Sequence, residues 1–142
     1  MLKGGKRIMK EQQEIIIRPY EEKDFPAIHK LNEQEGWSNL SAKQEQTKAA
    51  WQGSNVAFVA EHDGRLAGCL RALTDGAVSL YICELLIEKN MRGSGIGAKL
   101  MDHVHNLYPT TRMELLASAT SRSYYEEKKF RPFYGFRKTH QE

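Results

Sequence analysis

The chain has 142 residues, of which 40% are hydrophobic and 27% charged, a composition typical of one globular domain. Its 21 basic and 18 acidic residues leave a net charge of +3 and form no basic stripe, which argues against a nucleic-acid partner. No apolar run approaches the ~20 residues that span a membrane, and the N-terminus lacks the apolar stretch of a signal peptide, so we expect a cytoplasmic protein with no membrane partner. We expect residues 1–13 to form a flexible tail and residues 14–142 a single domain.

The first third of the chain predicts one strand and two helices. Residues 14–18 are a β-branched run that a proline ends. A helix then begins at Asp24, which is a good capping residue, and stops at Gly36. A second helix begins at Ser41, where Ser-Ala-Lys-Gln fits a capping box, and it ends at Gly53.

Two Asp-Gly pairs predict tight turns in the middle of the chain. They stand at residues 63–64 and 75–76 and separate strands over residues 56–61, 66–73 and 77–88. Asp-Gly suits the type I′ turn because both central residues need a positive φ. The segment therefore predicts a three-stranded antiparallel meander.

The second of these turns also sets the expected strand register. A two-residue turn at residues 75–76 brings Cys69 opposite Ile82. Cys69 and Cys83 then point to opposite faces of the sheet, because side chains alternate along a strand. We therefore expect no disulfide between them and interpret both as reduced core residues.

The last third of the chain predicts a helix, a strand, a short helix and a final strand. The first helix covers about residues 95–107, whose apolar positions recur at helical spacing. A strand at 113–117 follows, then a short helix capped by Ser123 or by Ser121, then a strand at 131–137. The order predicts a mixed α/β domain with a mostly antiparallel sheet flanked by helices.

A glycine-rich segment, Arg92-Gly93-Ser94-Gly95-Ile96-Gly97, joins the third meander strand to the helix after it. Small residues let an anion approach the free N–H groups of the first helical turn, which the helix dipole also favours. Glycine loops also occur in dinucleotide-binding folds and in nucleotide hydrolases. The chain has no G-x-x-x-x-G-K-S/T motif, and antiparallel hairpins precede the loop, so neither alternative fits.

In this context the loop resembles a signature of the GNAT superfamily of acyl-CoA-dependent N-acyltransferases, Q/R-x-x-G-x-G/A. Residues 124–130, Tyr-Tyr-Glu-Glu-Lys-Lys-Phe, stand where that family has a second signature, F-Y-E-K-L-G-F. The resemblance covers about residues 14–138 and the family's order of elements. It implies acetyl-CoA as co-substrate, no metal, and transfer of the acetyl group to a primary amine of a small molecule or a protein.

The resemblance also implies roles for individual residues. The backbone of Leu86 and Ile87 would hold the pantetheine arm, and the amides of residues 92–97 the pyrophosphate. Glu84, expected on the face of the strand shared with Ile82 and Leu86, is the candidate base, directly or through a water. A structural ion pair is its alternative role.

Tyr125 is the candidate acid that protonates the leaving thiolate, and it also contacts the cofactor. Tyr124 and Tyr134 are nearby alternatives for this role. Ser118 replaces a cofactor-binding asparagine of the family, and Lys129 replaces a glycine. A lysine makes the turn at residue 129 less favourable if that turn needs a positive φ.

Three residues are candidates for binding the acceptor. Trp37 lies in a loop that walls the acceptor pocket in the family, and core packing is its alternative role. Arg71 and Asp75 flank the second turn, where an exposed ion pair or a turn residue is the alternative. Two other functions remain open: a non-catalytic acyl-CoA sensor and a nucleotide-phosphate binder. A homodimer is compatible with exposed strand edges.

Overall fold

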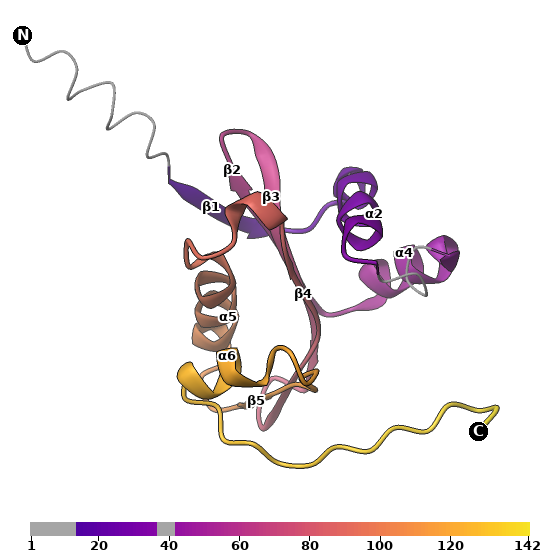
Figure 1. Cartoon of the computed structure of the whole chain (residues 1–142), viewed down its shortest axis with the longest axis vertical. Helices are drawn as coiled ribbons and strands as arrows, with labels where there is room; N and C mark the ends of the chain where they lie inside the picture. The colour runs from indigo at the N-terminus through magenta and orange to yellow at the C-terminus, as the bar shows by residue number, and fades with distance from the viewer. Residues whose placement is uncertain (1–13, 37–41) are drawn as a thin grey trace, which may run out of the picture.

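A computed structural model describes residues 14–36 and 42–142 of the chain, which form one five-stranded sheet with helices on both faces (Figure 1). The strand order is β1-β2-β3-β4-β5; the first four strands are antiparallel neighbours, and β5 runs parallel to β4. The predicted mixed α/β class is confirmed. None of the described helices is long and apolar enough to cross a membrane. The elements are β1 (Ile15–Pro19), η1 (Glu22–Asp24), α2 (Phe25–Gln34), α4 (Gln44–Gly53), β2 (Val56–His62), β3 (Arg65–Thr74), β4 (Ser79–Ile87), η2 (Lys89–Met91), α5 (Ile96–Leu107), β5 (Arg112–Glu114) and α6 (Arg122–Glu127).

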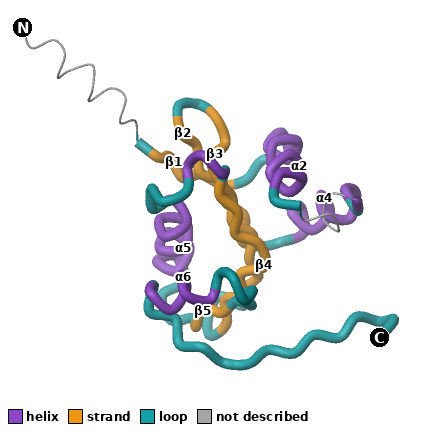
Figure 2. Tube along the Cα trace, viewed as in Figure 1, coloured by secondary structure: helices purple, strands orange, loops and turns teal. Residues whose placement is uncertain are grey.

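The sheet separates two hydrophobic clusters. Helix α5 covers one face, and α2 and α4 lie on the other (Figure 2). The α5 cluster is the larger, and its members include Val56, Leu70, Leu80, Ile82, Ile96, Leu100 and Val104. The cluster under α2 and α4 consists of Phe25, Ile28, Leu31, Trp51, Val59, Cys69 and Leu86. Both faces of the central strands are therefore buried.

The start of α2 differs from the prediction. Asp24 makes no side-chain cap of α2, which begins at Phe25. Its carboxylate accepts two hydrogen bonds from Arg18, at 2.7 and 2.9 Å, and one from the amide of Glu21. The bond to the Glu21 amide closes the 3-10 turn before the helix, and the Arg18 guanidinium holds the Asp24 carboxylate there. Gly36 has a φ of +75° and follows the helix as predicted.

The two Asp-Gly pairs form different turns. Asp63 and Gly64 have φ values of +55° and +75°, so the first is the predicted two-residue turn with positive φ at both positions. The second prediction is wrong, because Thr74 pairs with Leu80 and the five residues 75–79 lie between them. The carboxylate of Asp75 accepts hydrogen bonds from the amides of residues 77, 78 and 79, at 2.8 to 3.0 Å, and so stabilises a wider turn.

A β-bulge adds a second correction to the register. Glu84 pairs with Arg71 while Ile82 pairs with the next residue of β3, so Cys83 is an extra residue in β4. Cys69 consequently lies opposite Leu86 and not opposite Ile82. The bulge separates the side chains that we expected on one face, since Ile82 packs under α5 and Leu86 under α2.

Both cysteines are free, as predicted, but only one is a core residue. Cys69 is fully buried. Cys83 is half-buried at the bulge. The prediction that Cys83 belongs to the core is therefore wrong.

The C-terminal third is less regular than predicted. Strand β5 covers only residues 112–114, and α6 begins after Ser121, the second of the two predicted caps. Lys129 has a φ of +73°, the conformation that makes glycine the family's usual residue there. The predicted strand at residues 131–137 is wrong: this segment is an exposed coil that pairs with no strand of the described chain.

Candidate functional site

A cleft opens where β4 and β5 separate. β5 pairs with β4 only at residues 79–81, so the rest of that edge of β4 has no strand neighbour in the described chain. A cavity of about 420 Å³ lies there. Its lining residues are Glu35, Ile82, Cys83, Glu84, Leu85, Arg92, Leu115, Leu116, Ser118, Thr120, Ser121 and Tyr125. The topology thus brings together the candidate base, the candidate acid and part of the glycine-rich segment.

Glu84 reaches the cleft from the bulge in β4, and Arg71 holds it from β3. The side chain of Glu84 is only 4% exposed. Its Oε2 accepts a hydrogen bond from Arg71 Nε at 2.9 Å and forms an ion pair with Arg71 Nη2 at 2.8 Å. Arg71 Nη1 donates to Ser54 Oγ at 3.2 Å, which fixes the guanidinium from its other side. The second carboxylate oxygen of Glu84, Oε1, is buried and has no partner in the described chain.

The start of α5 offers a row of free amides. Gly93 and Gly95 have φ values of +85° and +87°, and no atom lies within 4 Å of where a Cβ would stand on either. Within the described chain, no backbone hydrogen bond is donated by residues 93–98; the first bond of the turn comes from the amide of Lys99. These unpaired N–H groups at a helix N-terminus fit a phosphate group.

Arg92 is less available to an anion than its place in the signature suggests. Its Nη2 forms an ion pair with Glu35, at the end of α2, and its Nε donates to the carbonyl of Ile87 at 3.1 Å. The pair ties the glycine-rich loop to the helix on the other face of the sheet. An incoming phosphate would compete with Glu35 for this guanidinium.

Tyr125 is the tyrosine that faces the cleft. Its ring packs edge-on against Tyr124 and Phe130, with centroids 5.1 and 5.4 Å away. Burial raises the pKa of the Tyr125 phenol, which keeps the proton on it at neutral pH. Tyr124 lies instead against α5, where a Cβ on Gly97 would meet its hydroxyl at 3.1 Å. Tyr134 is 92% exposed and does not line the cleft.

The other predicted site residues are Ser118, Asp75 and Trp37. Ser118 lines the cleft, and its amide and hydroxyl are both hydrogen-bonded to Ser121 Oγ. Asp75 is occupied by the amides of its own turn and does not line the cleft. Trp37 lies outside the described residues. Sequence reasoning missed Glu35 and Cys83 in this site, since no motif marks the end of α2 or the position of a bulge.

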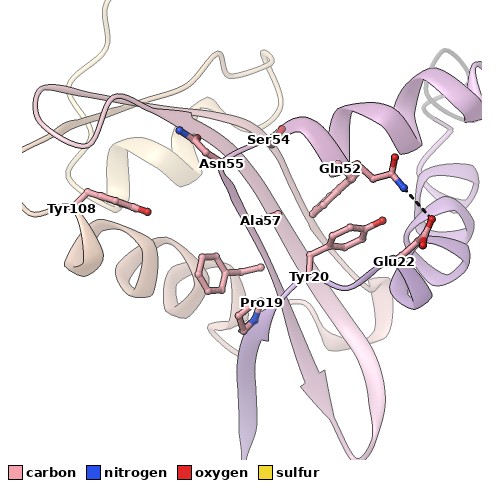
Figure 3. A pocket seen from close by; sticks show the side chains of 10 residues that line it. Pro19, Tyr20, Glu22, Gln52, Ser54, Asn55, Ala57 and Tyr108 are labelled. Atoms are coloured by element: carbon pink, nitrogen blue, oxygen red, sulfur yellow. Dashed lines mark hydrogen bonds between the residues drawn. The ribbon is translucent and has the colours of Figure 1, made fainter.

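A second hollow, of about 440 Å³, lies where β1 ends and β2 begins, and it shares no lining residue with the cleft (Figure 3). Tyr20 and Trp51 stack against each other in it at 5.0 Å, and Gln52 donates to Glu22 at 3.0 Å. None of its lining residues begins an α-helix. Among the described residues, no group of three or more His, Cys, Asp or Glu side chains could hold a metal ion.

Comparison with known proteins identifies the family to which the chain belongs. The model of the acetyltransferase (GNAT) domain family matches residues 9–142, so the chain belongs to this family and is an acyltransferase. No curated protein sequence matches the chain significantly.

Solved structures share the fold at low sequence identity. A GNAT-family acetyltransferase from Streptococcus pneumoniae is 20% identical, with 91% of this chain and 98% of that chain covered and a TM-score of 0.74. A GCN5-related N-acetyltransferase from Ralstonia eutropha is 17% identical, covering 91% and 100%, with a TM-score of 0.71. A predicted acetyltransferase from Clostridium acetobutylicum, solved with acetyl-CoA, is 15% identical, covering 89% and 96%, with a TM-score of 0.63.

Proposed function

We propose that the protein transfers an acetyl group from acetyl-CoA to a primary amine of a small molecule or a protein, in the cleft between β4 and β5. The observation that carries this proposal is the buried, unpartnered Oε1 of Glu84 in the same cleft as the Tyr125 phenol. A buried carboxylate oxygen without a partner is costly, so a ligand that donates a proton or a hydrogen bond to it is favoured.

The cofactor residues fit the chemistry of acetyl-CoA. The free amides of residues 93–97 would hold the pyrophosphate, and the open edge of β4 at Leu86 and Ile87 would pair with the pantetheine arm. Ser118 would contact the arm from the opposite wall. When bound, acetyl-CoA supplies the acetyl group as an activated thioester.

Glu84 and Tyr125 then carry out the proton transfers of the reaction. An amine such as that of lysine has a pKa of about 10.4 and must lose a proton before it attacks. Glu84 Oε1 accepts this proton, directly or through a water, while Arg71 keeps the other oxygen in place. As the new C–N bond forms and the C–S bond breaks, Tyr125 donates its phenolic proton to the leaving sulfur, and the second proton that the nitrogen loses on becoming an amide restores the phenol, directly or through a water.

A second function has one observation in its favour. The Arg71–Glu84 pair is the kind of buried ion pair that also serves structure alone, and a non-catalytic acyl-CoA sensor would keep it. We also propose a cytoplasmic location, because a reducing compartment keeps the two thiols free. We propose a homodimer as well. We assign no role in this reaction to Trp37 or Asp75. Arg71 positions the Glu84 carboxylate.

Release of free thiol from acetyl-CoA in the presence of a panel of primary amines tests the reaction. We expect release that depends on at least one amine. Cofactor-dependent thermal stabilisation with no release on any amine would favour the sensor. Stronger stabilisation by ATP or NAD than by acetyl-CoA would contradict both acyl-CoA functions.

A substitution in the loop tests the cofactor site. Gly95→Asp adds bulk and negative charge beside the free amides, so we expect the affinity for acetyl-CoA, measured by calorimetry, to fall by about 100-fold or more. Gly76→Asp is the matched control, because Gly76 has a similar φ of +80° in an open turn that does not line the cleft. Equal affinities of the two variants would show that the loop assignment is wrong.

A further inference from the structure

Cys83 is a free thiol in the β4–β5 cleft that the proposed reaction does not use. It lines the cavity together with Glu84 and Tyr125. The residue is half-buried, and its Sγ lies 3.8 Å from the carbonyl oxygen of Tyr81, to which the thiol donates a weak hydrogen bond. The other cysteine of the sequence, Cys69, is fully buried in the cluster under α2 and does not line the cleft.

The β-bulge accounts for the position of this thiol. Glu84 pairs with Arg71 while Ile82 pairs with the next residue of β3, so Cys83 has no partner on that strand. On the other side, β5 pairs with β4 only as far as Tyr81. Cys83 therefore stands where β4 and β5 begin to separate, at the beginning of the cleft.

An independent feature indicates that this end of the cleft receives a ligand. The side chain of Glu84 is only 4% exposed, and its Oε1 has no hydrogen-bond partner in the described chain. Such a buried oxygen is costly, so the cleft beside Cys83 favours an occupant that donates to it. At the other end of the cleft, the free amides of residues 93–97 fit a phosphate group.

The order of these features along the chain brings the sulfur end of a bound coenzyme A toward Cys83. The glycine-rich loop follows the C-terminal end of β4, so an arm that starts there passes Ile87 and Leu86 first. The four residues from Ile87 back to Cys83 cover about 13 Å of extended strand, which a pantetheine arm can span. This step rests on the proposed function, which puts the cofactor in the same cleft.

We propose that Cys83 is a redox-sensitive modification site that forms a mixed disulfide with coenzyme A. The Cys83 thiolate attacks one sulfur of a coenzyme A disulfide, the oxidised form of the thiol that the reaction releases. A new S–S bond forms, the old S–S bond breaks, and the departing coenzyme A sulfur takes up the proton that Cys83 gave up. The attached coenzyme A then fills the cleft and excludes acetyl-CoA until a thiol reduces the disulfide.

The cleft makes this reaction selective for coenzyme A. Burial raises the pKa of the Cys83 thiol, so little thiolate is available at neutral pH to an oxidant that does not bind. A coenzyme A disulfide held by the loop amides brings its sulfur to the thiol at a high effective concentration. Glutathione disulfide has the same S–S bond but no pyrophosphate, so it lacks this advantage.

Intact-mass spectrometry of the full chain treated with coenzyme A disulfide tests the proposal. We expect one coenzyme A per chain, and peptide mapping of the wild type should find it on Cys83. Cys69→Ala should still be modified, and Cys83→Ser should not. Glutathione disulfide at the same concentration should react at least about 10-fold more slowly. No adduct, an adduct on Cys69, or equal rates for the two disulfides overturns the proposal.

Two further measurements separate this proposal from the proposed function. Saturating acetyl-CoA should protect Cys83 from the disulfide, and the adduct should abolish thiol release from acetyl-CoA until dithiothreitol is added and removed. Cys83→Ser should keep its own activity after the same treatment. Calorimetry with acetyl-CoA on untreated protein tests the cofactor site alone. Acetyl-CoA binding without an adduct contradicts the modification only, whereas no acetyl-CoA binding contradicts the proposed function and the modification with it.

Discussion

The two walls of the cleft are held by the fold in different ways. Strand β4 pairs with β3 from Leu80 to Ile87, and both of its faces are covered by helices. The opposite wall pairs over three residues of β5 only and continues as an exposed loop to α6. The candidate base, Glu84, is on the first wall and the candidate acid, Tyr125, on the second.

This difference indicates a division of roles. The carboxylate sits on a wall where Arg71 and Ser54 fix its position before any ligand arrives, as preorganised groups require. The phenol sits on α6, which has no buried residue of its own, and we expect this wall to adjust to the acyl-CoA. Four substitution pairs test whether the walls differ in this way.

The two arginine–glutamate pairs of the site give the largest expected contrast. Arg71→Gln leaves the buried Glu84 carboxylate without its partner, so we expect the free energy of unfolding to fall by about 3–5 kcal/mol. Arg92→Gln breaks a more exposed pair with Glu35 and should cost at most about 1 kcal/mol. Urea denaturation of both variants measures the difference. Similar losses would mean that the Arg71–Glu84 pair is no more firmly anchored than the Arg92–Glu35 pair.

Substitution of the two catalytic candidates gives the next contrast. Glu84→Gln removes the base and should lower kcat by about 100–1,000-fold, and Tyr125→Phe removes the acid and should lower kcat by about 10–100-fold. Both should bind acetyl-CoA as the wild type does. Tyr134→Phe is the control, because this exposed tyrosine does not line the cleft. An unchanged kcat for Tyr125→Phe would move the acid to another group.

Two leucines, one on each wall, compare packing. Leu86 is 3% exposed and packs under α2, so Leu86→Ala should cost about 2–4 kcal/mol of unfolding free energy. Leu116→Ala on the exposed wall should cost less than about 0.5 kcal/mol. Thermal or urea unfolding of the two variants measures both losses of unfolding free energy. A large loss for Leu116→Ala would show that its wall is packed more firmly than we infer.

The smallest expected effect is a gain in stability on the weaker wall. Lys129 has a φ of +73°, which costs a non-glycine residue about 1 kcal/mol. Lys129→Gly should therefore raise the free energy of unfolding by about 0.5–1 kcal/mol. Lys128→Gly is the control, because Lys128 has a φ of −86° and gains nothing from glycine. A gain for Lys128→Gly of the same size would show that backbone strain at Lys129 is not the cause.

The sequence predicted the elements of the meander and the loop at residues 92–97 because local signals determine them. The same Asp-Gly pair nevertheless produced two turns: Asp63 adopts a positive φ, whereas the Asp75 carboxylate binds three amides and widens its turn. No pattern in β4 distinguishes these outcomes, and the bulge at Cys83 depends on pairing with β3. The register, and hence the Arg71–Glu84 pair, was therefore beyond prediction.

Residues 131–137 illustrate the opposite limit. Their strand-like composition was recognised from the sequence, yet a strand also needs an edge to pair with, and within one chain the segment passes β5 without pairing. Glu35 was missed for a similar reason, since its proximity to Arg92 arises only when α2 packs on the sheet. Local patterns predict elements, and tertiary contacts decide which groups share a site.

A crystal structure with acetyl-CoA bound tests the central claim most directly. We predict the pyrophosphate on the amides of residues 93–97 and the thioester between Glu84 and Tyr125. An acetyl-CoA bound outside the β4–β5 cleft, for instance in the hollow beside Trp51, would contradict the account.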